Sequence, residues 1–344
     1  MSKTTKAASV KTPLRIGMVG AGMISYHHLV AWSRDQRAKV VAICDPDFDR
    51  AQKRAREFGV SAAYDGLDSL LAAQEVDALD IASPRETHAA LVDIAADRSI
   101  DVLCQKPLTP TLAEAEALSR RVDGRIRLMV HENWRFRPWY RALKRQFDDG
   151  AFGDLRWAGM ATISSGLLPD ASGRRPALER QPFMAHEKRL AIAEVLIHHI
   201  DVMRWLLGPL KLLSARTAHK LPEVQGETLA SLFLETAQGA PVTIIGDMAA
   251  PGFSPRTDDR LEVVGSKASA VFDRSVLTLM TAVERTEPFD FDQGYQASFD
   301  GVIRHFIDRL VDGGPFETDV TDNLETLRIV EQAYAAAVRS EERS

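Results

Sequence analysis

The chain has 344 residues, enough for two domains, and its 45% hydrophobic and 26% charged content is typical of a globular protein. Its 43 Lys and Arg and 48 Asp and Glu residues leave a net charge of −5, which favours neither nucleic-acid nor membrane binding. No apolar run reaches the roughly 18 residues of a membrane span. Residues 1–12 lack the apolar segment of a signal peptide, so we expect a flexible tail and a cytoplasmic protein. The two cysteines, Cys44 and Cys104, end strand-like runs and are expected to be buried free thiols.

The first predicted strand, residues 14–19, ends in a glycine turn that opens a helix. Gly20 can make the tight turn, and Gly22, without a side chain, lets the backbone approach a pyrophosphate. Ser25 occupies the third position of this fingerprint, where a small residue allows the helix to pack on the strand. The next strand ends on Asp45, where a carboxylate can bind the ribose diol of adenosine. The pattern predicts a dinucleotide site, with NAD favoured over NADP because Asp45 would repel a 2′-phosphate. A turn without a ligand is the alternative.

Strands and helices then alternate as far as residue 127. The strand-like runs are short and nearly all apolar, as in buried parallel strands. This alternation predicts a doubly wound parallel sheet, a Rossmann dinucleotide-binding domain, over residues 13–127. The expected strands are 76–82, 101–104 and 126–130, and the expected helices are 49–58, 67–73, 87–96 and 111–122.

Beyond residue 128 the rhythm changes, and we expect a second α/β domain over residues 128–344. Strand-like runs with Gly and Pro turns follow one another, which predicts an antiparallel or mixed sheet. A polar, Pro- and Arg-rich loop spans residues 164–189, and a ligand cleft is expected between the domains. The expected strands are 230–235, 242–248, 260–264 and 270–272, and the expected helices are 139–149, 191–207, 295–311 and 320–339.

Lys106 follows the strand at 101–104, in the sequence Gln105-Lys106-Pro107. Open α/β sheets bind ligands at the carboxyl ends of their strands, so this lysine could donate to a substrate oxygen near a nicotinamide. An ordinary surface lysine is the alternative, because most lysines lie at the surface.

Glu194, His198 and Asp201 fall at i, i+4 and i+7 of the helix predicted over residues 191–207, and so on one stripe. The two carboxylates could stabilise a protonated His198, as a general base requires after it accepts a proton. A solvated polar face is the alternative. His199 points elsewhere on the helix and is expected to pack.

Residues 131–138, His-Glu-Asn-Trp-Arg-Phe-Arg-Pro, also follow a predicted strand. Their polar and aromatic groups could bind a hydroxylated ligand, and an Arg-rich joint between domains would look the same. His88 follows Ser83-Pro84 and could lie near a cofactor, although a lone histidine is more often structural. No spacing such as His-Glu-x-x-His indicates a metal site.

Taken in order, these segments resemble the Gfo/Idh/MocA oxidoreductase family over nearly the whole chain. Each motif is short, and their order and spacing together make the resemblance specific. The similar segments are the glycine turn through His28, Ser83-Pro84 with His88, Gln105-Lys106-Pro107, and residues 133–138, 194–201 and 261–269.

The resemblance implies a Rossmann domain followed by an α/β domain whose large, open, mostly antiparallel sheet makes contacts in a homodimer or homotetramer. It implies catalysis by Lys106, His198 and Glu194, with His198 taking a hydroxyl proton and Lys106 polarising the same oxygen. Asp201 and Pro107 would support them. The residues implied to bind the cofactor are Gly20, Gly22, Met23, Ile24, Asp45, Ser83, Pro84, His88, Gln105 and Lys106. Those implied to bind substrate are Lys106, Asn133, Trp134, Arg135, Glu194 and His198.

The sequence departs from the family pattern at four of these places. Gln105 replaces a glutamate, so Lys106 loses an adjacent negative charge. Glu194 is one methylene longer than the usual aspartate, and Leu196 replaces a glycine and is expected to narrow the space beside the site. Ser25 is expected to loosen the packing of the cofactor.

We therefore expect an NAD-dependent dehydrogenase that acts on a secondary alcohol of a sugar, inositol or related polyol. One alternative is a redox-neutral glycosidase that uses tightly held NAD. Another is a cofactor-binding regulator without turnover, against which the presence of Lys106 and His198 argues.

Overall fold

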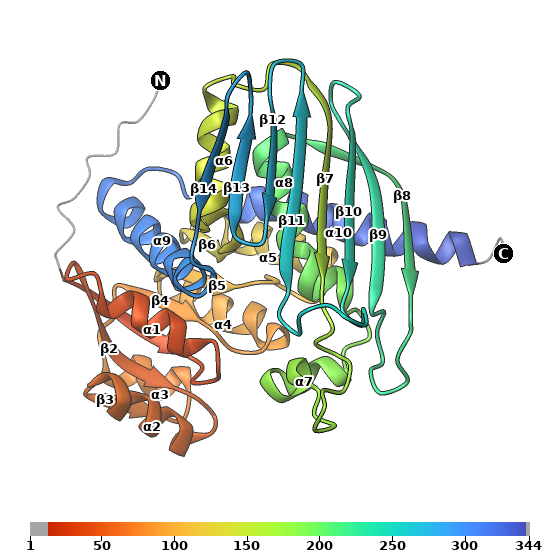
Figure 1. Cartoon of the computed structure of the whole chain (residues 1–344). Coiled ribbons are helices and arrows are strands. Elements are labelled where there is room, and N and C mark those ends of the chain that lie inside the picture. The colour runs from red at the N-terminus through yellow and green to blue at the C-terminus, as the bar shows by residue number, and fades with distance from the viewer. Residues whose placement is uncertain (1–12, 342–344) are drawn as a thin grey trace. The chain divides into compact units, whose positions relative to one another are not determined.

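A computed structural model describes residues 13–341 of the chain (Figure 1). The tail expected over residues 1–12 lies outside the described residues. The chain forms two compact units. Unit 1 contains the described residues up to Phe136 together with Tyr295–Glu325, and unit 2 contains Arg137–Gly294 and the described residues from Thr326 onward. No helix between residues 13 and 341 is both long and apolar enough to cross a lipid bilayer.

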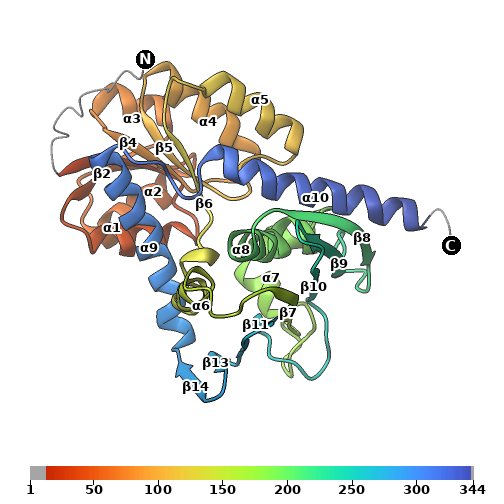
Figure 2. The same cartoon turned by 90° about the horizontal axis from the view of Figure 1, so that it is seen from above.

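Unit 1 is built on a parallel sheet whose six strands, within the described residues, run in the order β3-β2-β1-β4-β5-β6. This order confirms the predicted doubly wound Rossmann sheet. Helices α4 and α5 lie on one face of the sheet, and α1 and α9 lie on the other (Figure 2). The elements are β1 (Leu14–Val19), α1 (Ser25–Ser33), β2 (Ala38–Cys44), α2 (Phe48–Phe58), β3 (Ala62–Tyr64), α3 (Leu67–Ala73), β4 (Ala78–Ile81), α4 (Arg85–Asp97), β5 (Asp101–Gln105), α5 (Leu112–Val122), β6 (Leu128–His131) and the short helix η1 (Trp134–Phe136).

The strands of unit 1 are short apolar runs because helices cover both faces of the sheet. All four residues of β4 are buried, including Asp80 in its interior. Two of the helices that follow strands begin at side-chain caps: Asp47 accepts a hydrogen bond at the start of α2, and Thr111 and Glu114 form a capping box at the start of α5. These caps fix where the chain turns at the carboxyl edge of the sheet.

Helix α9 (Phe291–Asp312) belongs mostly to unit 1, although it lies near the end of the chain. Its side chains Phe299 and Phe306 join the buried cluster that also contains Ile16 and Trp32. The sequence analysis assigns all of residues 128–344 to one domain. The structure places Tyr295–Glu325 in unit 1, because the apolar face of α9 packs into the core of that unit.

Unit 2 is built on a sheet whose eight strands, within the described residues, run in the order β14-β13-β12-β11-β7-β10-β9-β8. The neighbouring strands are antiparallel except β7 and β10, which confirms the expected large, mostly antiparallel sheet. The strands are β7 (Leu155–Ile163), β8 (Leu210–Ala218), β9 (Leu229–Thr236), β10 (Pro241–Asp247), β11 (Asp258–Gly265), β12 (Ser269–Asp273), β13 (Val276–Met280) and β14 (Glu284–Pro288). The helical elements are α6 (Pro138–Asp148), α7 (Pro176–Arg180), η2 (Pro182–Ala185), η3 (Ala191–Leu196), α8 (Ile197–Leu207) and α10 (Val320–Glu341), of which α10 begins in unit 1.

The two faces of the second sheet differ. Helices α6, α8 and α10 lie behind it in Figure 1. Along β9 and β10, buried side chains alternate with outward-facing ones, as expected for a sheet covered on one face. On the outward face, Phe233 and Ile245 are 42% and 41% exposed.

Several elements of unit 2 differ from the prediction. Strand β7 lies between β11 and β10, and it is absent from the predicted strands because several of its residues are small and give a weak apolar pattern. Strand β14 has every residue exposed and so carries no hydrophobic signal. The loop predicted over residues 164–189 contains α7 and η2, and Leu167 within it is fully buried.

Both cysteines are free and buried, as expected. Burial raises the pKa of the Cys44 thiol to about 12 and that of the Cys104 thiol well above its usual value. Both side chains therefore stay protonated and unreactive at neutral pH.

Candidate active site

The glycine turn after β1 depends on its glycines for two different reasons. Gly20 has a φ of +100°, and a Cβ atom there would lie 2.5 Å from the carbonyl oxygen of Ala82. At Gly22 a Cβ atom would meet no atom within 4 Å. Gly20 therefore permits the turn itself, whereas Gly22 leaves open space in front of it, as the approach of a pyrophosphate requires.

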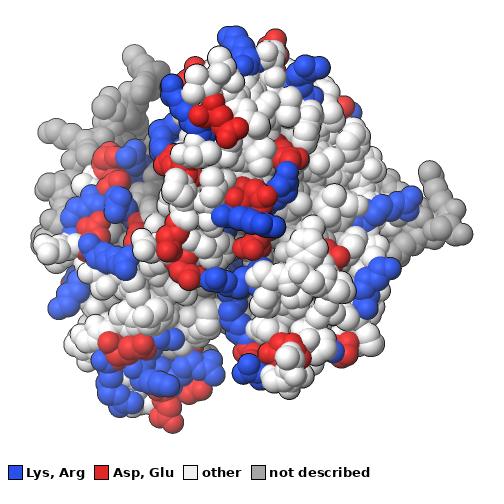
Figure 3. Space-filling model, in the orientation of Figure 1, with Lys and Arg blue, Asp and Glu red and all other residues white. Residues whose placement is uncertain are grey.

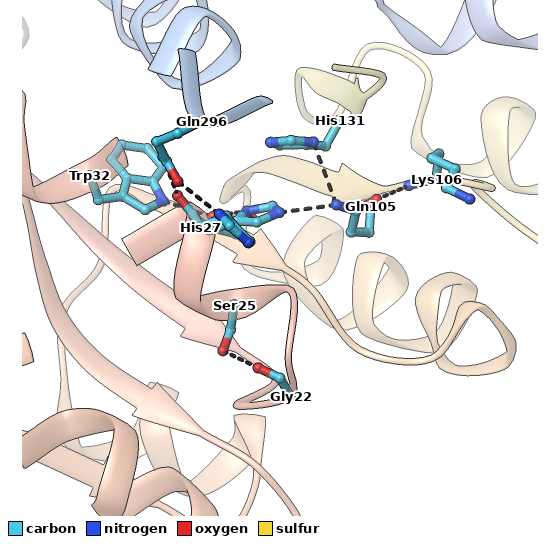
Figure 4. Close-up of polar contacts among 10 residues, drawn as sticks. Gly22, Ser25, His27, Trp32, Gln105, Lys106, His131 and Gln296 are labelled. Carbon is cyan, nitrogen blue, oxygen red and sulfur yellow. Dashed lines mark hydrogen bonds and ion pairs between the residues drawn. The ribbon is translucent and has the colours of Figure 1, made fainter. Parts of the chain in front are cut away.

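Ser25 supports the turn. Its side chain is fully buried at the start of α1, and its hydroxyl donates to the carbonyl oxygen of Gly22 at 2.7 Å (Figure 4). Arg54 of α2 donates to the same carbonyl oxygen at 3.1 Å. The Ser25 hydroxyl thus has a partner within the turn itself.

Asp45 follows β2 and binds the same turn. Its carboxylate accepts hydrogen bonds from the backbone N–H groups of Ala21 at 2.8 Å and Asp47 at 2.9 Å. A pocket of about 770 Å³ opens beside the glycine turn. The residues that line this pocket are Ala21, Gly22, Met23, Arg50, Lys53, Arg54, Arg56 and Glu57. An open glycine turn at a helix N-terminus, with four basic side chains around it, fits the pyrophosphate of a dinucleotide.

Three predicted cofactor segments lie at one edge of the sheet in unit 1. Strands β1, β4 and β5 are parallel neighbours, so their carboxyl ends meet at this edge. The glycine turn follows β1, Ser83-Pro84 follows β4, and Lys106 directly follows β5. We call these three segments the carboxyl edge. Doubly wound sheets bind their ligands at this position.

His88 holds two of these segments. Its side chain is buried at the start of α4, with Nε2 2.9 Å from the Ser83 carbonyl oxygen. Its Nδ1 lies 3.1 Å and 3.2 Å from the carbonyl oxygens of Pro107 and Leu108. Burial lowers the pKa of His88, which favours the neutral imidazole with one ring N–H for these carbonyl groups.

A chain of hydrogen-bonded polar groups begins at the backbone N–H of Lys106 and continues through Gln105 (Figure 4). The Lys106 backbone N–H donates to Oε1 of Gln105 at 2.8 Å, and Nε2 of Gln105 lies 3.0 Å from Nε2 of His28. Nδ1 of His28 lies 2.8 Å from the carboxylate of Asp80, to which Trp32 also donates at 2.7 Å. None of the sequence motifs indicates this chain of hydrogen-bonded groups. An acidic residue inside the apolar run 76–82 was the available signal, because a buried carboxylate needs a partner.

The residues after β6 have partners inside unit 1. The Asn133 amide donates to the Ser298 hydroxyl at 2.8 Å. Arg135 is 1% exposed and forms an ion pair with Asp322 at 2.7 Å. Trp134 is half-buried, with its ring 6.3 Å from that of Tyr295. These contacts connect the end of β6 to α9 and to the start of α10.

Glu194 and His198 lie in unit 2, on two different kinds of helix. Glu194 belongs to the π-helical turn η3, and His198, 5% exposed, belongs to α8. The prediction of one regular helix over residues 191–207 is therefore wrong in its first part. In a π-helix each backbone hydrogen bond spans five residues, whereas in an α-helix it spans four. Glu194 and His198 therefore do not have the angular spacing that a regular α-helical stripe would give them.

Leu196, at the end of η3, packs into the sheet. It is fully buried, and a Cβ atom at Gly246 of β10 would lie 2.8 Å from its Cδ2. The sequence analysis expects Leu196 to narrow the space beside the site. In the structure its side chain lies against β10, where the missing side chain of Gly246 makes room for it.

Two further groups fix this helical segment. The Glu227 carboxylate accepts hydrogen bonds from the backbone N–H groups of Leu190 at 3.2 Å and Ile192 at 3.0 Å, and so caps the start of η3. Asp201, fully buried on α8, accepts from the Thr326 hydroxyl at 3.1 Å.

His199 anchors α8 to β11. Its Nε2 lies 2.8 Å from the Asp259 carboxylate and its Nδ1 lies 3.1 Å from the Val195 carbonyl oxygen. These two contacts hold the imidazole between β11 and the end of η3. Arg137 and Tyr140 also donate to Asp259, at 3.1 Å and 2.7 Å. The expected packing role of His199 is confirmed.

The pKa values of Asp259 and Tyr140 follow from their burial and from the charges around them. Burial alone would raise the pKa of the Asp259 carboxyl, but the charge and hydrogen bond of His199 and the charge of Arg137 outweigh it. The pKa of Asp259 is consequently well below its usual value. Burial and the Asp259 carboxylate raise the pKa of Tyr140, so the phenol keeps its proton.

Two family models match the chain: "Oxidoreductase family, NAD-binding Rossmann fold" over residues 14–131 and "GFO/IDH/MocA C-terminal domain" over residues 140–271. The chain is 31% identical over 345 residues to a D-apiose dehydrogenase of Rhizobium rhizogenes, covering 95% of this chain and 96% of the relative. The chain belongs to the Gfo/Idh/MocA oxidoreductase family. It is 28% identical to an inositol 2-dehydrogenase of Rhizobium meliloti, over 95% of this chain and 96% of that protein.

A solved member of similar structure is an oxidoreductase from Agrobacterium radiobacter in complex with NAD⁺, L-tartaric acid and magnesium. Its TM-score is 0.89 and its identity 28%, over 96% of this chain and 97% of that one. With the family and the glycine turn both in place, this Gfo/Idh/MocA protein is an oxidoreductase, a dehydrogenase whose cofactor is NAD.

Proposed function

We propose that this dehydrogenase oxidises a secondary alcohol of a sugar, inositol or related polyol, with Lys106 and His198 as the pair that handles the proton. The observation that carries the proposal is the position of Lys106 directly after β5, at the same carboxyl edge as the glycine turn. The names of the relatives, D-apiose dehydrogenase and inositol 2-dehydrogenase, support the substrate class.

The proposed reaction divides hydride and proton between cofactor and protein. NAD held at the glycine turn would supply the acceptor for the hydride of the carbinol carbon. His198 accepts the hydroxyl proton as general base, so that the carbon–oxygen bond becomes a carbonyl. The Lys106 ammonium group donates a hydrogen bond to the same oxygen and stabilises the negative charge that develops on it. Glu194 binds a neighbouring hydroxyl or orients His198, and Asp201 and Pro107 support the pair.

The remaining proposed roles concern cofactor and substrate binding. We propose that Gly20, Gly22, Met23 and Ile24 hold the pyrophosphate and that Asp45 binds the adenosine ribose. Ser83, Pro84, His88, Gln105 and Lys106 would line or support the nicotinamide end of the site. Asn133, Trp134 and Arg135 are proposed to bind or frame the substrate.

A pair of single substitutions tests the catalytic assignment on any alcohol that the enzyme oxidises. Lys106→Ala and His198→Ala should each lower kcat by roughly 10²-fold or more, because each removes a group that acts on the reacting oxygen. NAD binding to His198→Ala, measured by calorimetry, should stay near that of the wild type. Added imidazole should restore part of the activity of His198→Ala.

The exposed Lys39 on β2 provides the matched control, and Lys39→Ala should keep full activity. Unchanged kcat in Lys106→Ala or in His198→Ala would contradict the assignment. Cleavage of aryl glycosides without net NADH would instead indicate the redox-neutral glycosidase.

We also propose that the enzyme is a homodimer or homotetramer in which a second copy covers the outward face of the sheet in unit 2. Four large apolar side chains lie exposed on neighbouring strands of this face, and the surface over β7, β10 and β9 is largely free of charged side chains (Figure 3). These side chains are Trp157, Leu213, Phe233 and Ile245. The two buried free thiols suit a reducing compartment, and we propose the cytoplasm as the site of action.

A further inference from the structure

The orientation of the Gln105 side-chain amide is set by its backbone neighbour. The Lys106 N–H can only donate, so the atom that faces it at 2.8 Å must be the oxygen Oε1. The amide nitrogen Nε2 then points the other way, to Nε2 of His28 at 3.0 Å. The amide of Gln105 is therefore an acceptor toward Lys106 and a donor toward His28.

This orientation sets the tautomer of His28. Because the amide of Gln105 donates, Nε2 of His28 must accept and carry no proton. The proton is then on Nδ1, which donates to the Asp80 carboxylate at 2.8 Å. Trp32 donates to the same carboxylate oxygen at 2.7 Å, so Asp80 receives two hydrogen bonds. Each bond in the chain has one possible direction, and together they run from the Lys106 N–H to the Asp80 carboxylate.

Aromatic and polar side chains of unit 1 enclose His28 on several sides. His28 and Asp80 are both fully buried. The ring of His131 stacks on that of His28 at 4.1 Å, and Phe299 lies 5.4 Å away. Nδ1 of His131 also faces Nε2 of Gln105, at 3.5 Å. The two amide hydrogens of Gln105 therefore face one ring nitrogen of each histidine.

We propose that Gln105 is a positioning residue for Lys106, and that its amide is required because a carboxylate would reverse one hydrogen bond of the Asp80–His28–Gln105 chain. Through this chain the interior of the sheet fixes the backbone at Lys106, and with it the root of the lysine side chain. The inference rests on the proposed function, in which Lys106 acts on the substrate oxygen. It also explains how this protein accommodates glutamine at the position where the family motif has glutamate.

Two variants of nearly equal size test the direction of the bonds. In Gln105→Glu, a carboxylate oxygen faces the unprotonated Nε2 of His28, so either the contact breaks or the ring takes up a proton. In the double variant Gln105→Glu, Asp80→Asn, donor and acceptor are exchanged in both bonds of His28. The amide nitrogen introduced at position 80 can donate to Nδ1 of His28 from the place of Oδ1, 3.1 Å away, while the amide oxygen in the place of Oδ2 still accepts from Trp32. The Nε2–H group of His28 can donate to the carboxylate introduced at position 105, which closes the chain again in the opposite direction.

The tautomer is read directly by NMR of protein labelled with ¹⁵N-histidine, with the His28 signals assigned by their loss in His28→Asn. The wild type should show a protonated Nδ1 and an unprotonated Nε2. The double variant should show the opposite tautomer. A wild-type His28 protonated on Nε2, or on both nitrogens, would overturn the inference whether or not the protein is an active dehydrogenase.

Kinetics test the link to Lys106. Gln105→Glu should lower kcat by tenfold to roughly 10²-fold, the range expected when a catalytic group is displaced by about 1 Å, with a smaller change in the KM for NAD. The double variant should regain most of this loss. Gln105→Met, which removes both hydrogen bonds without adding charge, should also lower kcat, whereas the exposed Gln36→Glu should not.

The outcomes separate the inference from the proposed function. Full activity of Gln105→Glu, or a double variant no better than Gln105→Glu, overturns the positioning role of Gln105. Full activity of Lys106→Ala overturns the proposed function and, with it, the link from Gln105 to catalysis, while the NMR tautomer still tests the chain itself. If Gln105→Glu does not fold, Gln105→Met and the wild-type tautomer decide the question.

Discussion

Gly20 and Gly22 stand two residues apart, and the structure predicts different consequences for replacing them. Gly20→Ala should destabilise the fold, because φ is +100° and the new Cβ would lie 2.5 Å from the Ala82 carbonyl oxygen. Gly22→Ala should keep its unfolding midpoint, because open space surrounds the position, but it should bind NAD more weakly. Thermal unfolding and NAD titration of both variants check this. Equal loss of stability in the two would contradict the distinction.

His88 should make the stability of the enzyme depend on pH. Burial lowers its pKa in the folded state, whereas the unfolded chain keeps a value near 6.5. The unfolded state therefore binds the proton more readily, so the contribution is complete above about pH 6.5 and is lost as pH falls below it. Urea unfolding from pH 8 to 5 should show a weaker decline in His88→Asn than in the wild type. Parallel curves for the two proteins would contradict the buried neutral imidazole.

The sequence indicates those candidate site residues whose proposed role depends on local spacing. Gly20, Asp45 and Lys106 were predicted because a turn, a strand end and a motif reveal them within a few residues. The chain from Asp80 through His28 to Gln105 was not predicted. Its members come from three separate elements, and only the parallel register of β4 and β5 with α1 brings them into contact.

At the scale of elements, the segment from η3 to α8 carries the proposed catalytic residues of unit 2. Glu227 caps it, Leu196 packs it on β10, and His199 joins it to β11. The sequence predicted the helix and its buried face. It did not predict the π-helical turn, because that turn depends on contacts with β9 and β10 that periodicity does not encode.

Asp259 should be the most sensitive point of this segment. Asp259→Asn removes the charge that pairs with Arg137 and His199 inside the protein, which should lower the free energy of unfolding by about 3–5 kcal/mol. The exposed neighbour Asp258 serves as the control, and Asp258→Asn should change the free energy of unfolding by less than about 1 kcal/mol. Chemical denaturation of both variants measures the difference. A loss at Asp259 no larger than at Asp258 would show that the buried pairing does not stabilise α8.

At the scale of the whole molecule, the sequence predicted both sheets and their classes but not the return of α9 to unit 1. An amphipathic helix shows that it has an apolar face without showing which sheet that face covers. Phe299 and Phe306 belong to the core of the parallel sheet, although they lie more than 150 residues beyond its last strand in the chain.

The outward face of the second sheet predicts the oligomeric state. The wild type should elute with the mass of a dimer or tetramer in size-exclusion chromatography with light scattering. The double variant Trp157→Glu, Phe233→Glu should elute with the mass of a single chain, because association would bury two charges in the apolar contact. Phe253, 54% exposed outside the strands, is the control, and Phe253→Glu should leave the mass unchanged. A single-chain mass for the wild type would contradict the proposed interface.

The central claim is that this protein passes a hydride from a polyol to NAD, and formation of reduced nicotinamide tests it most directly. The wild-type enzyme would be assayed with NAD and with NADP against a panel of sugars, inositols and other polyols. We predict steady formation of NADH on at least one member of the panel and much slower formation of NADPH, since Asp45 is proposed to bind the adenosine ribose and would repel a 2′-phosphate. No reduced nicotinamide on any substrate, from a protein that still binds NAD, would contradict the account.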